Sequence, residues 1–500
     1  MIERTPPGPP RGIFLDNVFQ PPEGRGMIDV RDPADGSLVG QALRGTADDA
    51  RAAIESAARA QPAWEEIGAA ARAKLLLRTA ERLRARSEEL ARLITREMGK
   101  VLYESRGEVA GAVDNLEFYP AFARTLSGEE VSGLPAGETM RLVWVPRGVV
   151  VAITPWNFPA ATVTRKIAPA LVGGNTMVLK PSSATPLSSL LIADAFREAG
   201  LPPGVLNVVP GSGSEIGAAL VQHPRCSTVT LTGSTASGVE VLRLAAPGVV
   251  KCLLELGGKA PVLVHRDADL DWAARATVWA RFWNAGQACI AAERCYVDRS
   301  IASEFLQKLE PLVRGLRVGP GLRAGVDVGP LYSPSAQTAV AGDVDRAVRD
   351  GARVVVGGKI PEDPELKKGA FYLPTILDGV EEENPVAQEE VFGPVLPILT
   401  YEEWGEAIER ANESRYGLSS YVFTRDLSLA ERAIRELKFG ETYVNRVGPE
   451  TPQGYHAGFR QSGLGGEGTV WGVRDYLQLK TVYVDWKEPH RADYFPPYRD

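Results

Sequence analysis

Hydrophobic residues recur with two different periods along the chain. Near the amino terminus they recur every three or four residues over residues 47–65 and 69–98, which predicts two long amphipathic helices. Thr46 and Asp49 have the spacing of a capping box at the start of the first helix. From Val149 onward the pattern changes to short β-branched runs that alternate with helical stretches, and this predicts strands joined by helices.

These strand-like runs form two series. The first contains VVVAIT, NTMVLK, VLNVVP and STVTLT between residues 149 and 232, and the second begins near Pro261 with PVLV and continues to ETYVN at residues 441–445. Alternating strands and helices build parallel sheets that carry helices on both faces. We therefore predict the α/β class, with two doubly wound, Rossmann-like domains divided just after residues 256–258.

Two segments stand apart from this alternation. Residues 128–147 are predicted to form a β-hairpin that interrupts the first domain, and residues 476–486 form a late strand with no local partner. Such a strand is expected to pair with the hairpin or with another subunit, so we predict a β-hairpin oligomerisation element. The remaining parts are a first domain at 1–127 and 148–256, a second domain at 257–475, and a C-terminal tail at 487–500. The tail combines aromatic residues with prolines, and we expect it to dock on its own or a neighbouring subunit.

Composition and charge narrow the class of protein. The 500 residues, 44% hydrophobic and 24% charged, suit a globular protein with two or three cores. A net charge of −7 and the lack of a Lys/Arg-rich run exclude nucleic acid as the expected partner. No run reaches the roughly 18 apolar residues of a membrane span. The start, MIERTPPGPPRG, resembles neither a signal peptide nor a transit peptide, so we expect a cytoplasmic protein that acts on a small molecule.

Four cysteines in a chain of this length are too few for a disulfide framework, and their spacing offers no metal site. Cys252 and Cys295 lie in apolar strand-like runs, where a thiol is usually a core residue. The sequence around Cys226 indicates no chemical role for its thiol. Cys289 follows Gly-Gln-Ala, whose small residues leave room for a substrate at the sulfur. The local sequence alone does not decide whether this thiol is reactive.

Glycine-rich turns follow two neighbouring strands of the first series. VVPGSGSEIG contains Gly211 and Gly213, and LTGSTASG contains Gly233 and Gly238. Backbone amides in such turns can approach a pyrophosphate at a helix N-terminus. A single glycine turn after a strand is usually only a turn, but two in succession favour a dinucleotide site.

Six segments together resemble the aldehyde dehydrogenase superfamily in their order and spacing. They are TPWNFP (154–159), VLKPS (178–182), LTGSTASG (231–238), LELGGKAP (254–261), GQAC (286–289) and EEVFGP (389–394). The resemblance extends from about residue 12 to residue 485. It implies an aldehyde dehydrogenase-like fold, an aldehyde substrate, NAD or NADP as cofactor, and a homo-oligomer, either a dimer or a tetramer.

The resemblance also implies three catalytic residues. Cys289 would be the nucleophile, which must react as a thiolate. The amide of Asn157, with the backbone N–H of Cys289, would stabilise the oxyanion that forms on the aldehyde. Glu255 would activate the water that releases the acid, and burial at the end of an apolar strand would bring its pKa near neutrality.

For the cofactor, the resemblance implies a larger set of residues. Lys180 would face the adenosine ribose, Glu390 would bind the nicotinamide ribose and Phe392 would pack beside the ring. The implied set is Thr154, Trp156, Lys180, Ser183, Gly211, Gly213, Ser234, Leu256, Glu390 and Phe392. Ser183 departs from the pattern, since many NAD-preferring members carry there a Glu that repels the 2′-phosphate of NADP. We therefore expect the use of both cofactors.

The C-terminal run from residue 437 to 466 is similar to lactaldehyde and glycolaldehyde dehydrogenases. This similarity implies substrate contacts from Arg165, Glu450 and His456, and we add Phe158 from TPWNFP. Polar groups around a channel favour a small hydroxyaldehyde, because a site built for hydroxyls penalises ligands that leave it unpaired. A structural alternative is that Arg165 pairs with an acid on its own helix.

Two other functions remain open. In a succinate-semialdehyde-type dehydrogenase, Arg165 would hold the distal carboxylate of the substrate. A non-catalytic binding or structural protein of the same fold would be expected to have lost Cys289, Glu255 or Asn157, and all three are present.

Overall fold

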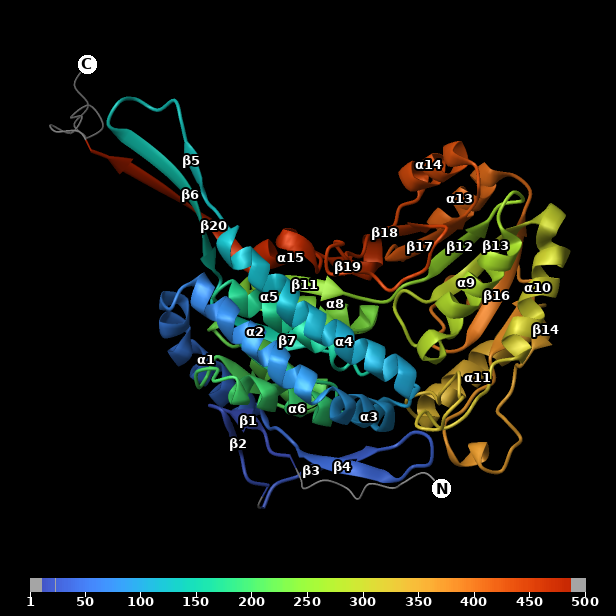
Figure 1. Cartoon of the computed structure of the whole chain (residues 1–500), viewed down its shortest axis with the longest axis horizontal. Coiled ribbons are helices and arrows are strands. Elements are labelled where there is room, and N and C mark those ends of the chain that lie inside the picture. Colours follow the sequence, from blue (N-terminus) through green and yellow to red (C-terminus); the bar gives the residue numbers. More distant parts are fainter. Residues whose placement is uncertain (1–10, 23, 487–500) are drawn as a thin grey trace.

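The structure is a computed structural model that describes residues 11–22 and 24–486. Two α/β units lie side by side, and a long β arm projects from the first unit away from the second (Figure 1). The first unit contains an eight-stranded sheet and the second a seven-stranded sheet, while the arm has three strands. A separate two-stranded sheet, β3 (Met27–Arg31) and β4 (Leu38–Leu43), lies along the first unit near the amino terminus (Figure 1).

The first sheet has a parallel centre with antiparallel edges. Its parallel strands, in spatial order, are β11 (Lys251–Glu255), β10 (Cys226–Thr232), β7 (Val149–Ile153), β8 (Thr176–Lys180) and β9 (Leu206–Val208). The antiparallel strands are β19 (Gly463–Leu464) at one edge and β1 (Phe14–Leu15) and β2 (Val18–Phe19) at the other. Parallel strands end at the same edge of a sheet, so the turns that follow them are neighbours.

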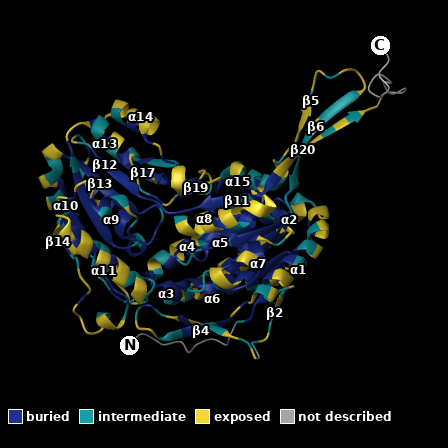
Figure 2. Cartoon of the chain, turned by 180° about the vertical axis from the view of Figure 1, so that it is seen from behind, coloured by how far each residue is buried: buried dark blue, intermediate teal, exposed yellow. Residues whose placement is uncertain are grey.

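Helices cover both faces of this sheet, so its central strands are largely buried, and β7 is wholly apolar. Val150 and Ala152 of β7 share a core with α2 (Ala69–Ala85), α3 (Ser87–Met98), α4 (Leu102–Phe118), α5 (Ala161–Val172) and α6 (Pro186–Glu198). The alternate residues Val149 and Val151 share another core with α1 (Ala47–Glu66), α7 (Gly213–Val221) and α8 (Thr235–Ala245). Figure 2 shows the strands buried beneath these helices.

The second sheet is parallel except at one edge. Its order is β14 (Arg353–Val356), β15 (Thr375–Asp378), β16 (Val395–Tyr401), β13 (Ala292–Asp298), β12 (Ala260–Val264), β17 (Ser419–Phe423) and β18 (Glu441–Val444), with β14 antiparallel. Its helices are α9 (Leu270–Phe282), α10 (Ala302–Arg314), α11 (Pro334–Arg349), α12 (Pro385–Gln388), α13 (Trp404–Asn412) and α14 (Leu427–Glu436). One continuous apolar core joins them to the sheet.

The arm contains the predicted hairpin, β5 (Glu129–Val131) and β6 (Glu138–Pro146), together with the late strand β20 (Leu477–Asp485). The expected pairing of the late strand with the hairpin is confirmed, since β20 runs antiparallel to β6 from Leu477 opposite Pro146 to Asp485 opposite Glu138. Most of β20 is exposed (Figure 2). The role of the arm in oligomerisation stays a prediction, and the tail at 487–500 lies outside the described residues.

The structure differs from the sequence-based expectations in three places. The capping box at Thr46 is confirmed, but the helix expected over 69–98 is two helices, α2 and α3, with the break at Arg86. Arg86 binds Glu89 and Asp194, and packing of α3 against α4 and α6 turns the chain there without a glycine or proline. Strands β1 to β4, β15 and helix α4 were not predicted.

The third difference concerns the boundary between the units. The expected division after residue 258 falls between β11 and β12, which belong to different sheets. However, residues 463–475, assigned to the second domain, return to the first unit, because β19 pairs with β11 and α15 (Thr469–Asp475) packs against α5. In the described part of the chain, no helix is long and apolar enough to span a membrane.

Candidate active site

A large cavity lies where α4 and α5 of the first unit meet residues of the second. Its volume is about 1170 Å³. All seven residues predicted for catalysis or substrate contact line it, namely Asn157, Phe158, Arg165, Glu255, Cys289, Glu450 and His456. The structure therefore brings these seven residues together from segments separated by up to three hundred positions, whereas the predicted cofactor residues lie elsewhere.

Cys289 follows a sharp turn that the backbone sets. After α9, a short 3-10 segment (Trp283–Gly286) has left-handed φ angles at Asn284, Ala285 and Gly286. Such angles are strained for residues with a Cβ, so the surrounding contacts must hold the turn. A Cβ at Gly286 would lie 2.2 Å from the Gly393 carbonyl oxygen, and the amide of Asn284 donates to Glu104 of α4 at 2.9 Å. The turn is thus fixed from both units.

Asn157 is held against this turn. Its side-chain amide donates to the carbonyl oxygen of Gln287 at 3.0 Å, two residues before Cys289. Asn284 donates to the same oxygen at 3.0 Å and to the Asn157 carbonyl at 3.3 Å. An amide nitrogen carries two N–H groups, so Asn157 keeps a second donor for an oxyanion near Cys289.

Glu255 ends β11 and is buried. Neither of its carboxylate oxygens accepts a hydrogen bond from a residue that the structure describes. Burial raises the pKa of Glu255 to about 8, because removal from water disfavours the charged form. The carboxyl group is therefore mostly protonated at pH 7 and becomes a base as the pH rises.

His456 lies beside Glu255 and lines the same cavity as Cys289. Its Nε2 is 3.7 Å from Oε2 of Glu255, and its Nδ1 is 3.0 Å from Oε1 of Glu441. Its backbone forms a bridge with Glu467, with both N–H···O distances at 2.8 Å. Glu441 was missed by sequence reasoning, although a carboxylate inside the short strand run ETYV is the kind of buried charge that signals a site.

Arg165 projects from α5 into the same polar cluster. Its guanidinium is 2.5 Å from Glu450 and 3.8 Å from Glu467, so the alternative that it pairs with an acid on its own helix is wrong. The reason is that α5 presents Arg165 to the late loop of the second unit rather than to another turn of itself. The next residue, Lys166, pairs with Glu467 at 2.6 Å and was also missed.

The predicted cofactor residues of the first unit lie along one edge of its sheet. Thr154, Lys180, Gly211, Ser234 and Leu256 end or follow β7, β8, β9, β10 and β11 respectively. Register pairs such as Ile153 with Lys180 place these strand ends side by side. This edge, outside the carboxyl ends of parallel strands, is where open α/β sheets bind nucleotides.

Several contacts suit a dinucleotide at that edge. Ser212 caps α7 and Ser234 caps α8, so two helix N-termini open toward the turns. Lys180 donates to the carbonyl oxygens of Pro181 and Gly211 at 3.1 and 2.9 Å, and burial lowers its pKa to about 8. The hydroxyl of Thr154 is buried without a hydrogen-bond partner among the described residues, which leaves it available to a ligand.

Glu390 lies at the link between the units and Phe392 contacts the first unit, whereas Ser183 and Gly213 belong to the first unit's strand edge. Oε1 of Glu390 accepts a hydrogen bond from the backbone N–H of Gly258 at 2.8 Å, and a Cβ at Gly257 would lie 2.6 Å from the other carboxylate oxygen. Phe392 meets the ring of Trp156 edge-on at 5.6 Å. Ser183 is partly exposed in the turn after β8, Gly213 begins α7, and Leu256 packs against Gly238.

The four cysteines are free thiols, and Cys289 is the one that lines the large cavity. Cys226 and Cys295 are buried in the strands β10 and β13, and burial raises the pKa of each. Within residues 11–22 and 24–486, no cluster of His, Cys, Asp or Glu side chains is placed to hold a metal ion.

Solved structures with the same architecture are known. A crystal structure of lactaldehyde dehydrogenase from Escherichia coli has a TM-score of 0.93 and 41% identity, covering 96% of this chain and 100% of that one. A structure of betaine aldehyde dehydrogenase from Staphylococcus aureus in complex with NAD+ has a TM-score of 0.94 and 33% identity, covering 97% of each chain.

Curated relatives cover nearly the whole chain as well. A D-glyceraldehyde dehydrogenase (NADP(+)) from Thermoplasma acidophilum is 42% identical over 95% of this chain and 96% of its own length. A succinate-semialdehyde dehydrogenase [NADP(+)] from Escherichia coli is 40% identical over 91% of this chain and 94% of its own. The model of the aldehyde dehydrogenase family matches residues 19–482. The chain therefore belongs to the aldehyde dehydrogenase family and is an oxidoreductase.

Proposed function

We propose that this enzyme oxidises a small hydroxyaldehyde, such as lactaldehyde or glycolaldehyde, to the carboxylic acid with NAD or NADP. The ion pair of Arg165 with Glu450 on the cavity wall carries this proposal. The pair offers a donor and an acceptor side by side, and a substrate hydroxyl can use both. A substrate carboxylate would accept from Arg165 but would be repelled by Glu450.

The relatives support the same substrate class. The enzymes at 42% and 41% identity are named for D-glyceraldehyde and lactaldehyde, which are both hydroxyaldehydes. The comparisons also support the use of both cofactors, because one relative is named for NADP and a structural neighbour was solved in complex with NAD+. Ser183 is uncharged, so at this position no carboxylate would repel the 2′-phosphate of NADP. This supports the use of both cofactors.

In the proposed mechanism, the sulfur of Cys289 attacks the aldehyde carbon, and the carbonyl oxygen becomes an oxyanion as the C–S bond forms. The free N–H of Asn157 and the backbone N–H of Cys289 are the donors for this oxyanion. Each such donor is worth roughly 3 kcal/mol when it is already in position. Asn157 is so positioned because its other contact, to Gln287, fixes the amide plane.

NAD or NADP, if bound at the strand edge, would supply the acceptor for the hydride that must leave the adduct before hydrolysis. Lys180, Glu390 and the capped starts of α7 and α8 would hold it there. Glu255 then takes a proton from a water molecule in the cavity, the water oxygen bonds to the acyl carbon, and the C–S bond breaks. The carboxylic acid leaves and Cys289 is restored.

A second candidate is a semialdehyde that carries a distal carboxylate. The relative named succinate-semialdehyde dehydrogenase, at 40% identity, favours it. In that case Arg165 would have to exchange its partner Glu450 for the substrate carboxylate. The two candidates therefore differ in whether Glu450 helps or opposes binding.

Steady-state rates with lactaldehyde, propanal and succinate semialdehyde, each with NAD and NADP, test the proposal. We expect kcat/KM for lactaldehyde to exceed that for propanal by about tenfold, the effect of roughly one hydrogen bond. In Glu450→Gln, the use of succinate semialdehyde should rise relative to lactaldehyde, because Arg165 loses a neutralising charge. The proposal fails if propanal matches lactaldehyde, and the second candidate replaces it if succinate semialdehyde is the best substrate of the unaltered enzyme.

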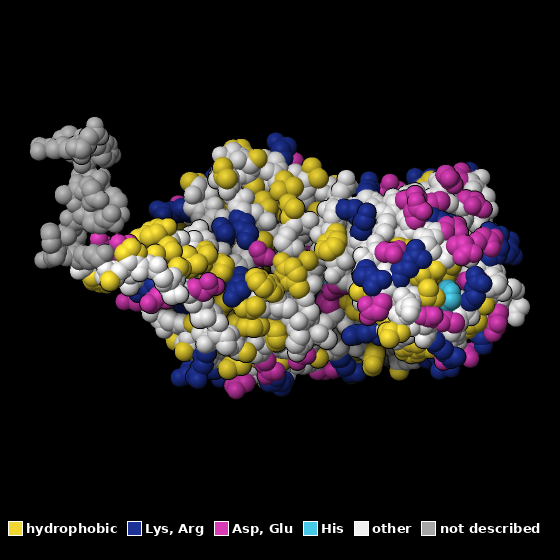
Figure 3. Space-filling model, turned by 90° about the horizontal axis from the view of Figure 1, so that it is seen from above, with side chains coloured by type: hydrophobic (Ala, Val, Ile, Leu, Met, Phe, Trp, Pro, Cys, Tyr) yellow, Lys and Arg dark blue, Asp and Glu magenta, His cyan; other side chains and the backbone are white. Residues whose placement is uncertain are grey.

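We also propose that the arm makes this enzyme a homo-oligomer, either a dimer or a tetramer. Leu479 and Tyr483 of β20 are 49% and 77% exposed, and hydrophobic side chains gather along the arm (Figure 3). An exposed strand edge with apolar residues is suited to pairing with another chain. Light scattering should give a multiple of the chain mass, and Leu479→Glu should reduce that mass. A monomer in the unaltered enzyme would contradict this.

A further inference from the structure

One face of α4 carries two carboxylates at the wall of the large cavity. Glu104 and Glu108 are four residues apart, so their side chains lie one turn apart on the same side of the helix, and both line the cavity. Neither has a part in the proposed mechanism. Each accepts hydrogen bonds from the backbone of a different segment, and these two segments carry the two donors proposed for the oxyanion.

Glu108 binds the segment that follows Asn157. Its Oε1 accepts from the backbone N–H groups of Ala160 at 2.7 Å and of Ala161 at 3.2 Å. These amides lie at the start of α5, where the N-cap residue, Ala160, has no side chain that could accept from them. A carboxylate from α4 therefore caps α5 and fixes the backbone three residues after Asn157.

Lys100 completes this contact from the chain just before α4. Its Nζ is 2.6 Å from Oε2 of Glu108, and the two side chains are 0% and 1% exposed. The same ammonium group lies 3.8 Å from the centroid of the Phe158 ring. Because a buried charge without its partner is costly, the pair keeps the carboxylate in place. Phe158, the neighbour of Asn157 in the chain, is thus held by the same group of residues.

Glu104 binds the segment that precedes Cys289. Its Oε1 accepts from the backbone N–H of Asn284 at 2.9 Å. The side-chain amide of Asn284 donates to the carbonyl oxygens of Asn157 at 3.3 Å and of Gln287 at 3.0 Å. Asn284 therefore joins the two segments that carry the oxyanion donors, and Glu104 fixes the residue that joins them.

We propose that Glu104 and Glu108 are positioning residues, which hold the amide of Asn157 and the backbone N–H of Cys289 at the separation that an oxyanion requires. The inference rests on the proposed function, in which these two groups are the oxyanion donors. Two donors stabilise one oxygen only when they converge on it, so a shift of either segment weakens this stabilisation without altering the sulfur. Since α4 belongs to the first unit and Cys289 to the second, the helix also aligns the two units at the site.

Two reagents test the proposal in the full-length enzyme, without aldehyde or cofactor. The ester p-nitrophenyl acetate acylates Cys289 through a tetrahedral oxyanion, whereas iodoacetamide alkylates the same sulfur by displacing iodide and forms no oxyanion. The ratio of the two rates reports oxyanion stabilisation, because a change in the reactivity of the sulfur alters both rates. Release of nitrophenolate and mass spectrometry of the Cys289 peptide give the two rates, with Cys289→Ala as the background.

The variants separate the loss of a contact from the loss of a charge. Glu104→Ala removes the acceptor for the Asn284 amide, and Glu104→Gln keeps a neutral acceptor there. The double variant Lys100→Met with Glu108→Ala removes the second contact without leaving a buried charge unpaired. Asn157→Ala removes one of the proposed donors itself.

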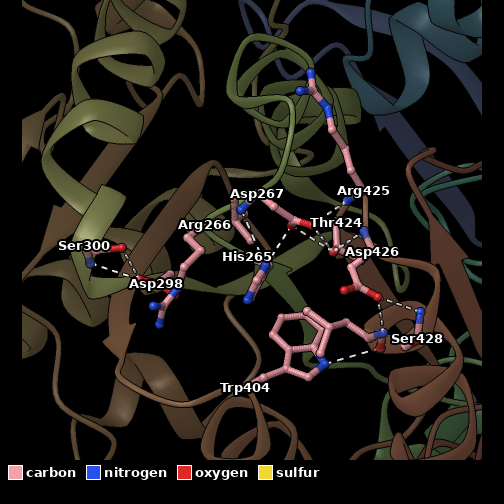
Figure 4. A network of polar contacts seen from close by, with 12 residues as sticks. His265, Arg266, Asp267, Asp298, Ser300, Trp404, Thr424, Arg425, Asp426 and Ser428 are labelled. Atoms are coloured by element: carbon pink, nitrogen blue, oxygen red, sulfur yellow. Dashed lines mark hydrogen bonds and ion pairs between the residues drawn. The ribbon is translucent and has the colours of Figure 1, made fainter.

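Asp267 offers a matched control at the carboxyl ends of β12 and β17. It is also a carboxylate that ties two segments together, since it accepts from the backbone N–H of Arg425 at 3.2 Å and from the hydroxyl of Thr424 at 2.8 Å (Figure 4). Asp267 does not line the large cavity. Asp267→Ala therefore tests whether the loss of any such carboxylate contact changes the ratio.

We expect the ratio of acylation to alkylation to fall roughly tenfold in Glu104→Ala and in the double variant, and about a hundredfold in Asn157→Ala. Glu104→Gln and Asp267→Ala should keep the ratio of the unaltered enzyme. An unchanged ratio in Glu104→Ala would overturn the proposal, and so would a fall of the same size in Glu104→Gln or Asp267→Ala. If Glu104→Ala does not fold, the double variant decides, because an unchanged ratio there overturns the proposal equally.

These rates also separate the inference from the proposed function. Neither reagent is an aldehyde, so an enzyme that shows the expected ratios but oxidises no hydroxyaldehyde refutes the substrate and leaves the role of the two carboxylates standing. An unchanged ratio in Asn157→Ala refutes the proposed oxyanion donors and the inference with them. A fall in Asn157→Ala with none in Glu104→Ala refutes only the positioning role.

Discussion

The side-chain nitrogen of Lys180 lies 2.9 Å from the carbonyl oxygen of Gly211 and so ties the last residue of β8 to the turn after β9. This contact fixes the spacing between two strand ends at the edge proposed for the cofactor. Ser183, three residues further along, lies partly exposed in the turn after β8. The side chain of residue 183 therefore determines the charge beside the site proposed for the adenosine ribose.

We predict that Ser183→Glu will weaken NADP far more than NAD. A new carboxylate would repel the 2′-phosphate, and KM for NADP should rise roughly tenfold while that for NAD changes little. Ser183→Gln is the control, since it has a similar size without the charge. Equal losses of kcat/KM for both cofactors in Ser183→Glu would show that this side chain does not face the ribose.

Cys289→Ala should abolish aldehyde oxidation and leave cofactor binding intact, because in the proposed mechanism the sulfur forms the covalent adduct, whereas other residues are proposed to hold the cofactor. Cys252→Ala is the matched control, since Cys252 is a half-buried thiol in β11 that does not line the cavity. Equilibrium dialysis with NADP and steady-state rates would measure the two properties. Turnover by the Cys289 variant at the unaltered rate would exclude the mechanism.

The raised pKa of Glu255, to about 8, predicts how hydrolysis depends on pH. The carboxyl is protonated below this pKa and cannot act as a base, so where hydrolysis limits turnover kcat should rise about tenfold per pH unit toward pH 8 and then level off. In Glu255→Gln, one equivalent of reduced cofactor should form rapidly and then nearly stop. A steady rate that is unchanged in this variant would mean that another group activates the water.

The sequence was sufficient to predict the two largely parallel sheets, the arm and seven of the residues that line the cavity. It succeeded there because β-branched runs indicate strands and because motif order places Asn157, Glu255 and Cys289 in one family pattern. It did not predict Glu441 or Lys166, whose partners His456 and Glu467 lie on other segments. Nor did it predict the break at Arg86 or the return of β19 to the first sheet, since tertiary packing decides both.

The last prediction concerns a buried cluster of charged side chains around Glu293. Glu293, four residues after Cys289, lies 2.7 Å from Lys259 and 2.6 Å from Arg281, and all three side chains are almost fully buried. Glu293 also accepts from the backbone N–H of Val391 at 3.1 Å, and Arg281 donates to the Val391 carbonyl oxygen at 2.6 Å. The cluster therefore holds the loop that carries Glu390 and Phe392.

Glu293→Ala should lower the free energy of unfolding by ~3–5 kcal/mol, because it leaves two buried cations without their shared partner. The control is Glu389→Ala, which removes an ion pair with Arg415 that is about half exposed and should cost at most about 1 kcal/mol. Thermal unfolding compares the two variants, and Glu293→Gln separates lost charge from lost hydrogen bonding. KM for NAD should also rise in Glu293→Ala, since Glu390 loses the support of its loop. Similar melting temperatures for the two alanine variants would show that the buried cluster stabilises the fold no more than an exposed pair does.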